Sequence, residues 1–293
     1  MNVSGKLVFK WWNGTLEHIE TPLYTEFRSL DLNNQNIGYC IASGPRRSSS
    51  VIRIDIQSKK FQVTVIRESR DAKEIDKLDI SIPTLVKFPS GDCTVSGWFY
   101  PPFSSSYKAA EGTLPPVVLF AHAGPTGAAT ESLNMKTQYF TSRGFAVFDV
   151  NYRGSTGFGT EFRNSLRKKW GLVDRDDMIN AAQYLVDNRF VNKDRICMMG
   201  SSASGYLLLA TIQNSSLIKA ASSLYGVCDL IALTKDTHKF ELGYNDQLIG
   251  KYPEEEHIYK QRSPVNKIDQ INCPIVFFHG DRDTVVPLSQ SIT

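Results

Sequence analysis

One stretch decides the fold of this chain: Gly200-Ser201-Ser202-Ala203-Ser204-Gly205-Tyr206. It follows an apolar run at 195–199 and precedes a second one at 207–212. This order predicts a strand, a tight turn and a helix. A serine in such a turn has a strained backbone that directs its hydroxyl into open space. Ser202 is therefore the candidate nucleophile, and the alternative is an ordinary turn in which serines cap the helix.

The residues two positions before and after a nucleophile in such a turn must be small, because the strand and the helix approach each other closely there. Gly200 meets this requirement. Ser204 stands where a glycine is usual and meets it only approximately. Small residues with serines recur in many loops, so the interpretation depends on the rest of the chain.

The composition is that of an ordinary globular protein. The 293 residues suffice for one large domain, or one domain and a smaller piece, and the net charge of +3 is too small to indicate nucleic-acid binding. The cysteines form no CxxC pair, which indicates neither a zinc site nor a redox motif. We expect Cys197 to be a buried, reduced thiol and the protein to be cytoplasmic. We expect no membrane association, because neither a signal-peptide core nor a membrane-spanning run is present.

Residues 1–79 are predicted to be a β-rich segment. Short strands are expected at 7–12, 38–42, 51–56 and 61–66, with a turn at Asn13-Gly14. This amounts to about one and a half blades of a β-propeller, at roughly 40–45 residues per blade. The charged stretch 68–78 is expected to be a connector.

Residues 80–293 are predicted to form an α/β domain with a mostly parallel sheet and helices on both faces, because strand and helix patterns alternate. Strands are expected at 94–100, 117–121, 145–150, 195–199, 220–225 and 274–278. Asp176 is expected to open a helix that buries Met178, Ala181, Ala182 and Leu185 on one face. We interpret Asp174, Asp176 and Asp177 as helix-starting residues, whose negative charges the helix dipole favours, and not as metal ligands.

An activated serine also needs a base, an acid that orients the base, and donors for the oxyanion. In α/β-hydrolases the acid follows the nucleophile, in the loop after a later strand. Two carboxylates of the 278–287 loop, Asp281 and Asp283, are candidates. The N–H of Ala203 and the loop around Gly124 are expected to form the oxyanion hole. His122 lies in that same loop, so it is expected to shape the loop and not to act as the base.

The general base is the missing part. The histidine should follow the acid along the chain, yet none follows Asp283. His238 and His257 lie between nucleophile and acid, and His279 is expected to end the last strand. We therefore expect this polypeptide to lack an ordinary triad.

A series of blocks resembles the prolyl oligopeptidase family of serine peptidases, in the branch of acylaminoacyl-peptidases and dipeptidyl aminopeptidase-like enzymes. The blocks are 149–159 (DVNYRGSTGFG), 170–174 (WGLVD), 236–241 (DTHKFE), 262–264 (RSP) and 283–287 (DTVVP). In that pattern Ser202 falls on the nucleophile, Asp283 on the acid and Gly124 on the oxyanion loop. The resemblance implies an α/β-hydrolase domain gated by a β-propeller, which limits substrates to short peptides.

The chain departs from the family pattern in several places. Ala123 and Ser204 each replace a glycine, and both changes are sterically mild. The base-bearing segment and most of the propeller are absent from the sequence, so the polypeptide is expected to be inactive. No cofactor and no metal are expected, and the open sheet edge could recruit a second copy of the chain.

Three functions stay open at this point. The first is a serine peptidase that releases aminoacyl, dipeptidyl or acylaminoacyl groups through an acyl-enzyme. The second is a carboxylesterase-like α/β-hydrolase, because one fold supports many chemistries. The third is a non-catalytic pseudoenzyme, which the missing histidine favours. The 149–159 block and the propeller-like strands favour the peptidase.

Overall fold

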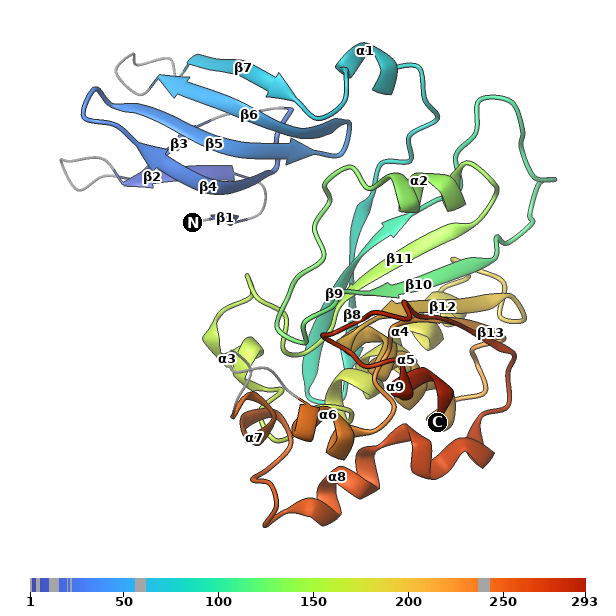
Figure 1. The fold of residues 1–293 in the computed structure, drawn as a ribbon. Coiled ribbons are helices and arrows are strands. Elements are labelled where there is room, and N and C mark those ends of the chain that lie inside the picture. Colours follow the sequence, from blue (N-terminus) through green and yellow to red (C-terminus); the bar gives the residue numbers. More distant parts are fainter. Residues whose placement is uncertain are drawn as a thin grey trace. The chain divides into compact units, whose positions relative to one another are not determined.

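The computed structural model describes residues 2–3, 6–10, 16–19, 21, 23–55, 62–236 and 243–293. The chain divides into two compact units (Figure 1). The first unit comprises Met1–Pro83, Phe103–Tyr107 and Thr130–Arg143, and the second comprises Thr84–Pro102, Lys108–Ala129 and Gly144–Thr293. The domain boundary at residue 80 stays a prediction.

The first unit is built mainly of antiparallel strands. β1 (Asn2–Val3), β2 (Lys6–Lys10) and β3 (Leu16–Ile19) form one sheet, and β4 (Glu26–Leu32), β5 (Ile37–Gly44), β6 (Arg47–Asp55) and β7 (Gln62–Glu68) form a second sheet in chain order. Alternate residues of β6 are buried, and Ile52 and Ile54 pack with Cys40 and Ala42 of β5. A four-stranded antiparallel sheet is the unit from which propellers are built, as the sequence predicts. The expected turn at Asn13-Gly14 lies outside the described residues.

Two short helices belong to this unit, α1 (Ala72–Ile75) within the expected connector and α2 (Met135–Thr141). Hydrogen bonds hold the α2 segment to parts of the unit far away in sequence. Thr130 Oγ1 donates to Glu26 Oε2 at 2.9 Å, and the Ser81 N–H donates to Gln138 Oε1 at 2.8 Å. Such bonds between distant segments leave no local pattern in the sequence.

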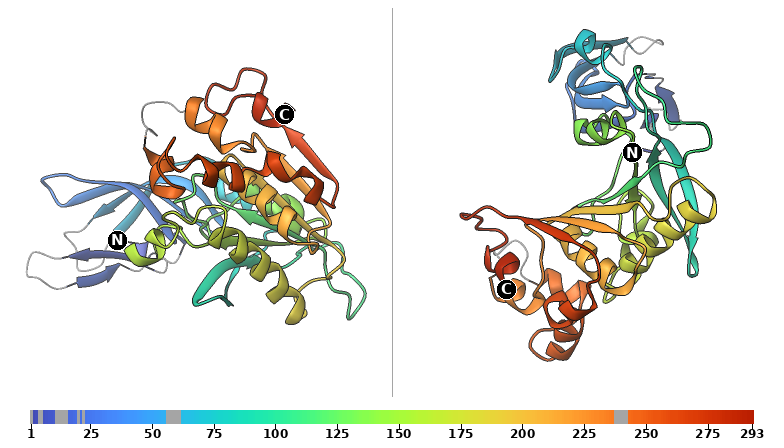
Figure 2. Two further views of the ribbon diagram at one scale, coloured as in Figure 1. Left: turned by 90° about the horizontal axis from the view of Figure 1, so that it is seen from below. Right: turned by 90° about the vertical axis from the view of Figure 1, so that its right-hand side faces the viewer.

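The second unit contains a seven-stranded sheet in the order β14-β13-β12-β10-β11-β9-β8. Its strands are β8 (Thr84–Ser90), β9 (Cys93–Tyr100), β10 (Val117–Ala121), β11 (Ala146–Asn151), β12 (Ile196–Ser201), β13 (Ala220–Leu224) and β14 (Ile275–Phe278). The five strands from β14 to β11 run parallel, and β9 and β8 are antiparallel additions. The mostly parallel sheet is the one that the sequence predicts. Figure 2 shows β14, in red, at one edge of this sheet.

Along the chain, the helices of this unit lie between its strands or after the last strand. They are α3 (Thr160–Asn164), α4 (Val173–Asp187), α5 (Ala203–Asn214), α6 (Leu230–Asp236), α7 (Tyr244–Leu248), α8 (Glu256–Arg262), the 3-10 helix η1 (Pro264–Gln270) and α9 (Ser289–Ile292). α4 begins at Val173, earlier than the predicted Asp176, and buries the predicted apolar face against the sheet. In the described part of the chain, no helix combines the length and the apolar character needed to cross a bilayer.

Asp174 and Asp176 lie in the first turn of α4, as expected of helix-starting residues. Asp174 and Asp177 are fully buried and do more than start the helix: the Arg153 guanidinium donates to Asp177 Oδ1 at 2.8 Å, and Ser90 Oγ donates to the same oxygen at 2.6 Å. Burial raises the pKa of Asp177, although these hydrogen bonds act in the opposite direction. Cys197 lies in β12 as predicted, but it is only partly buried.

Candidate active site

Ser202 occupies the turn between β12 and α5, which is the predicted order of strand, turn and helix. Its backbone angles, φ 54° and ψ −122°, are unusual for a residue with a side chain, and such conformations cost about 1–3 kcal/mol. Its side chain makes no capping hydrogen bond to α5. A capping serine has extended backbone angles and accepts a hydrogen bond from the first helical turn. Ser202 meets neither condition, so the cap interpretation does not fit it.

Close backbone packing fixes this turn. A Cβ added at Gly200 would overlap the backbone carbonyl of Ser204, at 2.6 Å from its carbon, and a Cβ at Gly205 would lie 2.5 Å from the Gly226 Cα. Ser204 Oγ accepts from the Ser201 N–H at 2.8 Å and donates to the Ser201 carbonyl at 2.9 Å. The serine that stands in place of a glycine therefore ties the start of α5 to the end of β12.

Two backbone segments are candidates for the oxyanion hole. Ala203 is the first residue of α5, and the first N–H groups of a helix have no partner within it. Gly124 has a φ of +54°, in the left-handed region that favours glycine, and its carbonyl accepts from the Gly127 N–H at 2.7 Å. This bond closes a compact turn after β10.

His122 is built into the same loop. Its ring stacks on Tyr152 with centroids 4.2 Å apart, and its Nε2 lies 2.7 Å from Ser155 Oγ. Since the Ser155 hydroxyl donates to the Tyr152 carbonyl at 2.7 Å, we assign the ring proton to Nε2. Burial lowers the pKa of His122 to about 4. The ring is thus neutral near pH 7 and joins its loop to the segment 152–155 after β11, as expected of a residue that shapes the loop.

Asp283 and Asp281 differ in their surroundings. Asp283 Oδ1 accepts hydrogen bonds from the N–H groups of Val285 at 2.9 Å and Val286 at 3.0 Å. These bonds hold the pKa of Asp283 below its usual range. No hydrogen bond between described residues involves the Asp281 side chain, which is exposed. Of the two carboxylates, Asp283 is the one whose orientation the loop fixes.

His279 directly follows β14, which ends at Phe278, and it is buried. Its Nε2 lies 2.8 Å from the Val286 carbonyl, which can only accept, so Nε2 carries the proton. Its Nδ1 lies 2.7 Å from Ser291 Oγ. The distance from Nε2 to Asp283 Oδ2 is 3.9 Å, too long for a hydrogen bond. Both ring nitrogens are therefore occupied, one by a partner in the loop and the other by Ser291 of α9.

The sheet brings the candidate groups to one edge. β10, β12, β13 and β14 are parallel neighbours in turn, so their carboxyl ends lie along the same side of the sheet. Gly124 follows β10, Ser202 and Ala203 follow β12, and Asp283 follows β14. Ligands of open α/β sheets bind beyond the carboxyl ends of the strands. The roles of these four residues nevertheless stay predictions. Block 236–241, with His238, lies largely outside the described residues, and no group of acidic, cysteine or histidine side chains suited to a metal ion occurs among the described ones.

Comparison with known proteins identifies the family. Residues 131–293 match the model of the prolyl oligopeptidase family. The chain is 30% identical to dipeptidyl aminopeptidase BIII of Pseudoxanthomonas mexicana over 60% of its own length and 26% of the relative's. It is 29% identical to an acylamino-acid-releasing enzyme of Arabidopsis thaliana, over 64% of its own length and 25% of that enzyme's.

A solved structure extends the similarity to nearly the whole chain. A puromycin-hydrolyzing peptidase of Mycobacterium tuberculosis is 37% identical and superimposes with a TM-score of 0.90. The match covers 96% of this chain and 42% of that peptidase. The α/β-hydrolase fold preceded by propeller-type strands is thereby confirmed. The chain spans about a quarter of the length of these two curated relatives.

Proposed function

This chain belongs to the prolyl oligopeptidase family of serine peptidases, and we propose that Ser202 is its nucleophile. The observation that carries the proposal is the strained backbone of Ser202, together with a side chain that makes no capping hydrogen bond to α5. A turn that costs free energy and leaves its hydroxyl without a helix-capping bond serves no evident structural purpose. It suits a serine whose hydroxyl must reach a substrate.

The remaining groups have complementary roles in this proposal. Ser202 Oγ attacks the carbonyl carbon of the scissile amide while a base removes its proton. The N–H of Ala203 and the loop around Gly124 stabilise the oxyanion that forms. Asp283 orients the base and stabilises its protonated form. The base then protonates the leaving amine, and water hydrolyses the acyl-enzyme.

The substrates proposed are short peptides and similar aminoacyl amides. The relatives carry the names dipeptidyl aminopeptidase and acylamino-acid-releasing enzyme, and the similar solved structure is a puromycin-hydrolyzing peptidase. The first two names denote release of a small group from one end of a substrate, and the third denotes hydrolysis of puromycin. We propose the same class of cleavage for the protein to which this chain corresponds.

The base remains the weak point of the polypeptide itself. His279 has both ring nitrogens engaged, and the His122 ring is held by Ser155, which follows β11. Neither ring is free beside Asp283, so we assign no base among the described residues, and His238 lies outside them. This favours a non-catalytic chain as the second candidate function.

Chemical rescue tests the proposal. Hydrolysis of aminoacyl p-nitroanilides and of p-nitrophenyl acetate would be measured with and without added imidazole, which can replace an absent base. We expect an imidazole-dependent rate on both substrates that falls at least about tenfold in Ser202→Ala and stays unchanged in the matched control Ser201→Ala. Activity on the ester alone would favour the carboxylesterase. A rate that imidazole does not change would favour the non-catalytic chain.

A further inference from the structure

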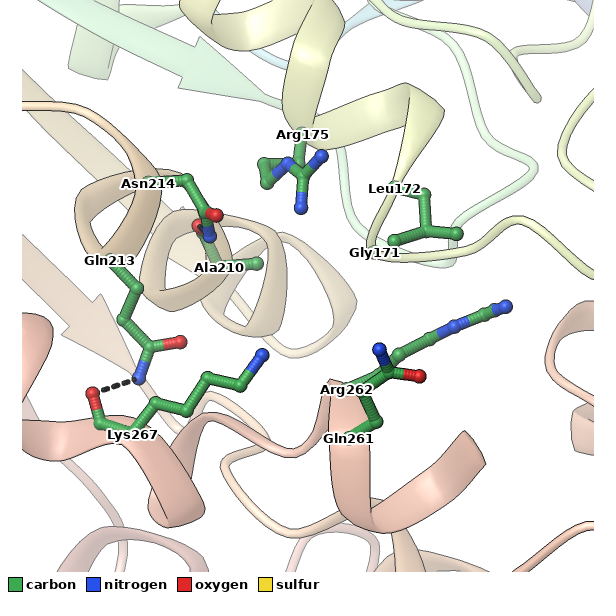
Figure 3. A pocket seen from close by; sticks show the side chains of 9 residues that line it. All are labelled: Gly171, Leu172, Arg175, Ala210, Gln213, Asn214, Gln261, Arg262 and Lys267. Atoms are coloured by element: carbon green, nitrogen blue, oxygen red, sulfur yellow. Dashed lines mark hydrogen bonds between the residues drawn. The ribbon is translucent and has the colours of Figure 1, made fainter. Parts of the chain in front are cut away.

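A polar pocket of about 160 Å³ lies between helices of the second unit (Figure 3). Four elements form it: the start of α4, the last turn of α5, the end of α8 and η1. Its lining residues are Gly171, Leu172, Arg175, Ala210, Gln213, Asn214, Gln261, Arg262 and Lys267. The pocket is separate from the Ser202 turn, which is at the opposite end of α5.

The lining carries positive charge and no negative charge. Arg175, Arg262 and Lys267 contribute cations, and no carboxylate is among the lining residues. Figure 3 shows the Arg175 guanidinium and the Lys267 ammonium directed toward the middle of the pocket from opposite sides, with the Gln261 amide beside them. Cations and amide groups that face the same space are the donors that proteins use for oxyanions.

The three cations differ in the hydrogen bonds and ion pairs that they already form within the protein. Arg262 donates to the carbonyls of Trp170 at 3.3 Å and Lys168 at 3.0 Å, so it forms part of the pocket wall. Arg175 donates to Asp176 Oδ1 through Nε and one Nη, which leaves its other Nη available. Lys267 takes part in no ion pair between described residues. Lys267 is therefore the cation most in need of a counter-ion.

The position of Lys267 is fixed by the fold. Gln213 Nε2, in the last turn of α5, donates to the Pro264 carbonyl at 2.7 Å and to the Lys267 carbonyl at 3.0 Å. These two bonds join η1 to α5 and hold the Lys267 backbone at the rim. A lysine on an anchored backbone loses less conformational freedom on binding than one on a mobile loop.

Three carboxylates act on the cations that line the pocket, and they limit its positive charge. Asp176 pairs with Arg175 and is half exposed. Asp174 is buried beneath the pocket, where its charge raises the pKa of Arg262 against the larger effect of burial, which lowers it. Glu255 also acts on Arg262 by its charge. None of these carboxylates forms a described ion pair with Lys267. The positive charge of the lining that has no described acidic partner is therefore that of Lys267.

We propose that this pocket is a binding site for a phosphate group, held by Lys267 and Arg175 with help from the Gln261 amide. The shared chemistry is a tetrahedral oxyanion, supplied either as free phosphate or as a phosphate monoester. The bound anion would connect α4, α5, α8 and η1. The site does not involve Ser202 and does not depend on the proposed peptidase function.

Titration calorimetry and thermal unfolding of the 293-residue chain test this site. Inorganic phosphate, phosphoserine and sulfate would be compared with potassium chloride at matched ionic strength, which excludes general screening. We expect saturable binding of one phosphate per chain and a rise in Tm of about 2–4 °C at high phosphate. Tighter binding of phosphoserine than of phosphate would identify a monoester as the ligand, and the reverse would identify free phosphate.

Two lysine variants decide between a site and a general charge effect. Lys267→Gln is expected to weaken phosphate binding about tenfold, because it removes a charge-assisted bond. The matched control is Lys193→Gln, which removes an equal charge from an exposed turn outside the pocket and should leave binding unchanged. Non-saturating binding, or equal loss in both variants, would overturn the proposal.

Discussion

Ser202 lies between a buried strand and a buried helix, whereas Asp283 lies in a loop at the exposed edge of the same sheet. Every residue of α5 from Ala203 to Ile212 is buried. Beside Asp283, by contrast, most of β14 is exposed, including Val276, Phe277 and Phe278. The geometry of Ser202 is imposed by backbone packing, and that of Asp283 by two hydrogen bonds within its own loop.

The difference shows how one site combines two kinds of positioning. Strain at Ser202 persists because the surrounding packing over-determines the turn. The orientation of Asp283 depends on local hydrogen bonds at a partly exposed position, each of which contributes only about 0.5–1.5 kcal/mol. Substitutions near Ser202 should therefore affect the stability of the fold, and substitutions near Asp283 should act mainly within the loop.

The largest expected effect concerns Asp174, which lies near α5. Burial raises the pKa of Asp174 to about 7, and its Oδ2 has no hydrogen-bond partner among the described residues. A carboxyl with a raised folded-state pKa stabilises the fold below its unfolded pKa of about 4, and this stability is lost as the pH rises toward 7. The loss is at most about 4 kcal/mol, from a shift of about three pKa units.

Denaturant unfolding at several pH values checks this. We expect Asp174→Asn to remove most of the decline in unfolding free energy between about pH 4 and 7. Asp176→Asn, a change of the same kind at a half-exposed position of the same helix, serves as the control and should leave the decline in place. A decline of equal size in Asp174→Asn would show that another group causes it.

A pair of glycines contrasts the two regions directly. Gly200→Ala introduces a Cβ that overlaps the Ser204 carbonyl, so it should lower the unfolding free energy by about 3 kcal/mol. Gly280→Ala, in the loop of Asp283, meets no atom within 4 Å and should change stability by less than about 0.5 kcal/mol. Thermal or denaturant unfolding measures both, and similar losses for the two variants would contradict the contrast.

The smallest expected effect concerns the two carboxylates of the loop. Asp283→Ala removes the acceptor for two N–H groups and should cost about 1 kcal/mol, whereas Asp281→Ala should cost almost nothing. Because the pKa of Asp283 is lowered in the fold, its contribution is present above about pH 4 and disappears as the pH falls through the lowered value. The difference in unfolding free energy between pH 7 and pH 2 should therefore be smaller for Asp283→Ala than for the unsubstituted chain.

The sequence predicts the strand and helix around Ser202 because both are continuous apolar runs separated by small residues. The same is true of β10, and the small and apolar residues of β11 and β13 also predict strands. β8 is not predicted, because Lys87 interrupts its apolar residues and Pro89 stands next to its end. The ion pair of Arg153 with Asp177 also leaves no signal, because a contact between residues 24 positions apart depends on the tertiary fold.

Labelling of the nucleophile tests the central claim most directly. The chain would be treated with a fluorophosphonate in the presence of imidazole, digested, and mapped by mass spectrometry. We expect one imidazole-dependent adduct, on Ser202, that is absent from Ser202→Ala and present in Ser201→Ala. An adduct on another residue, or equal labelling of Ser202→Ala, would contradict it.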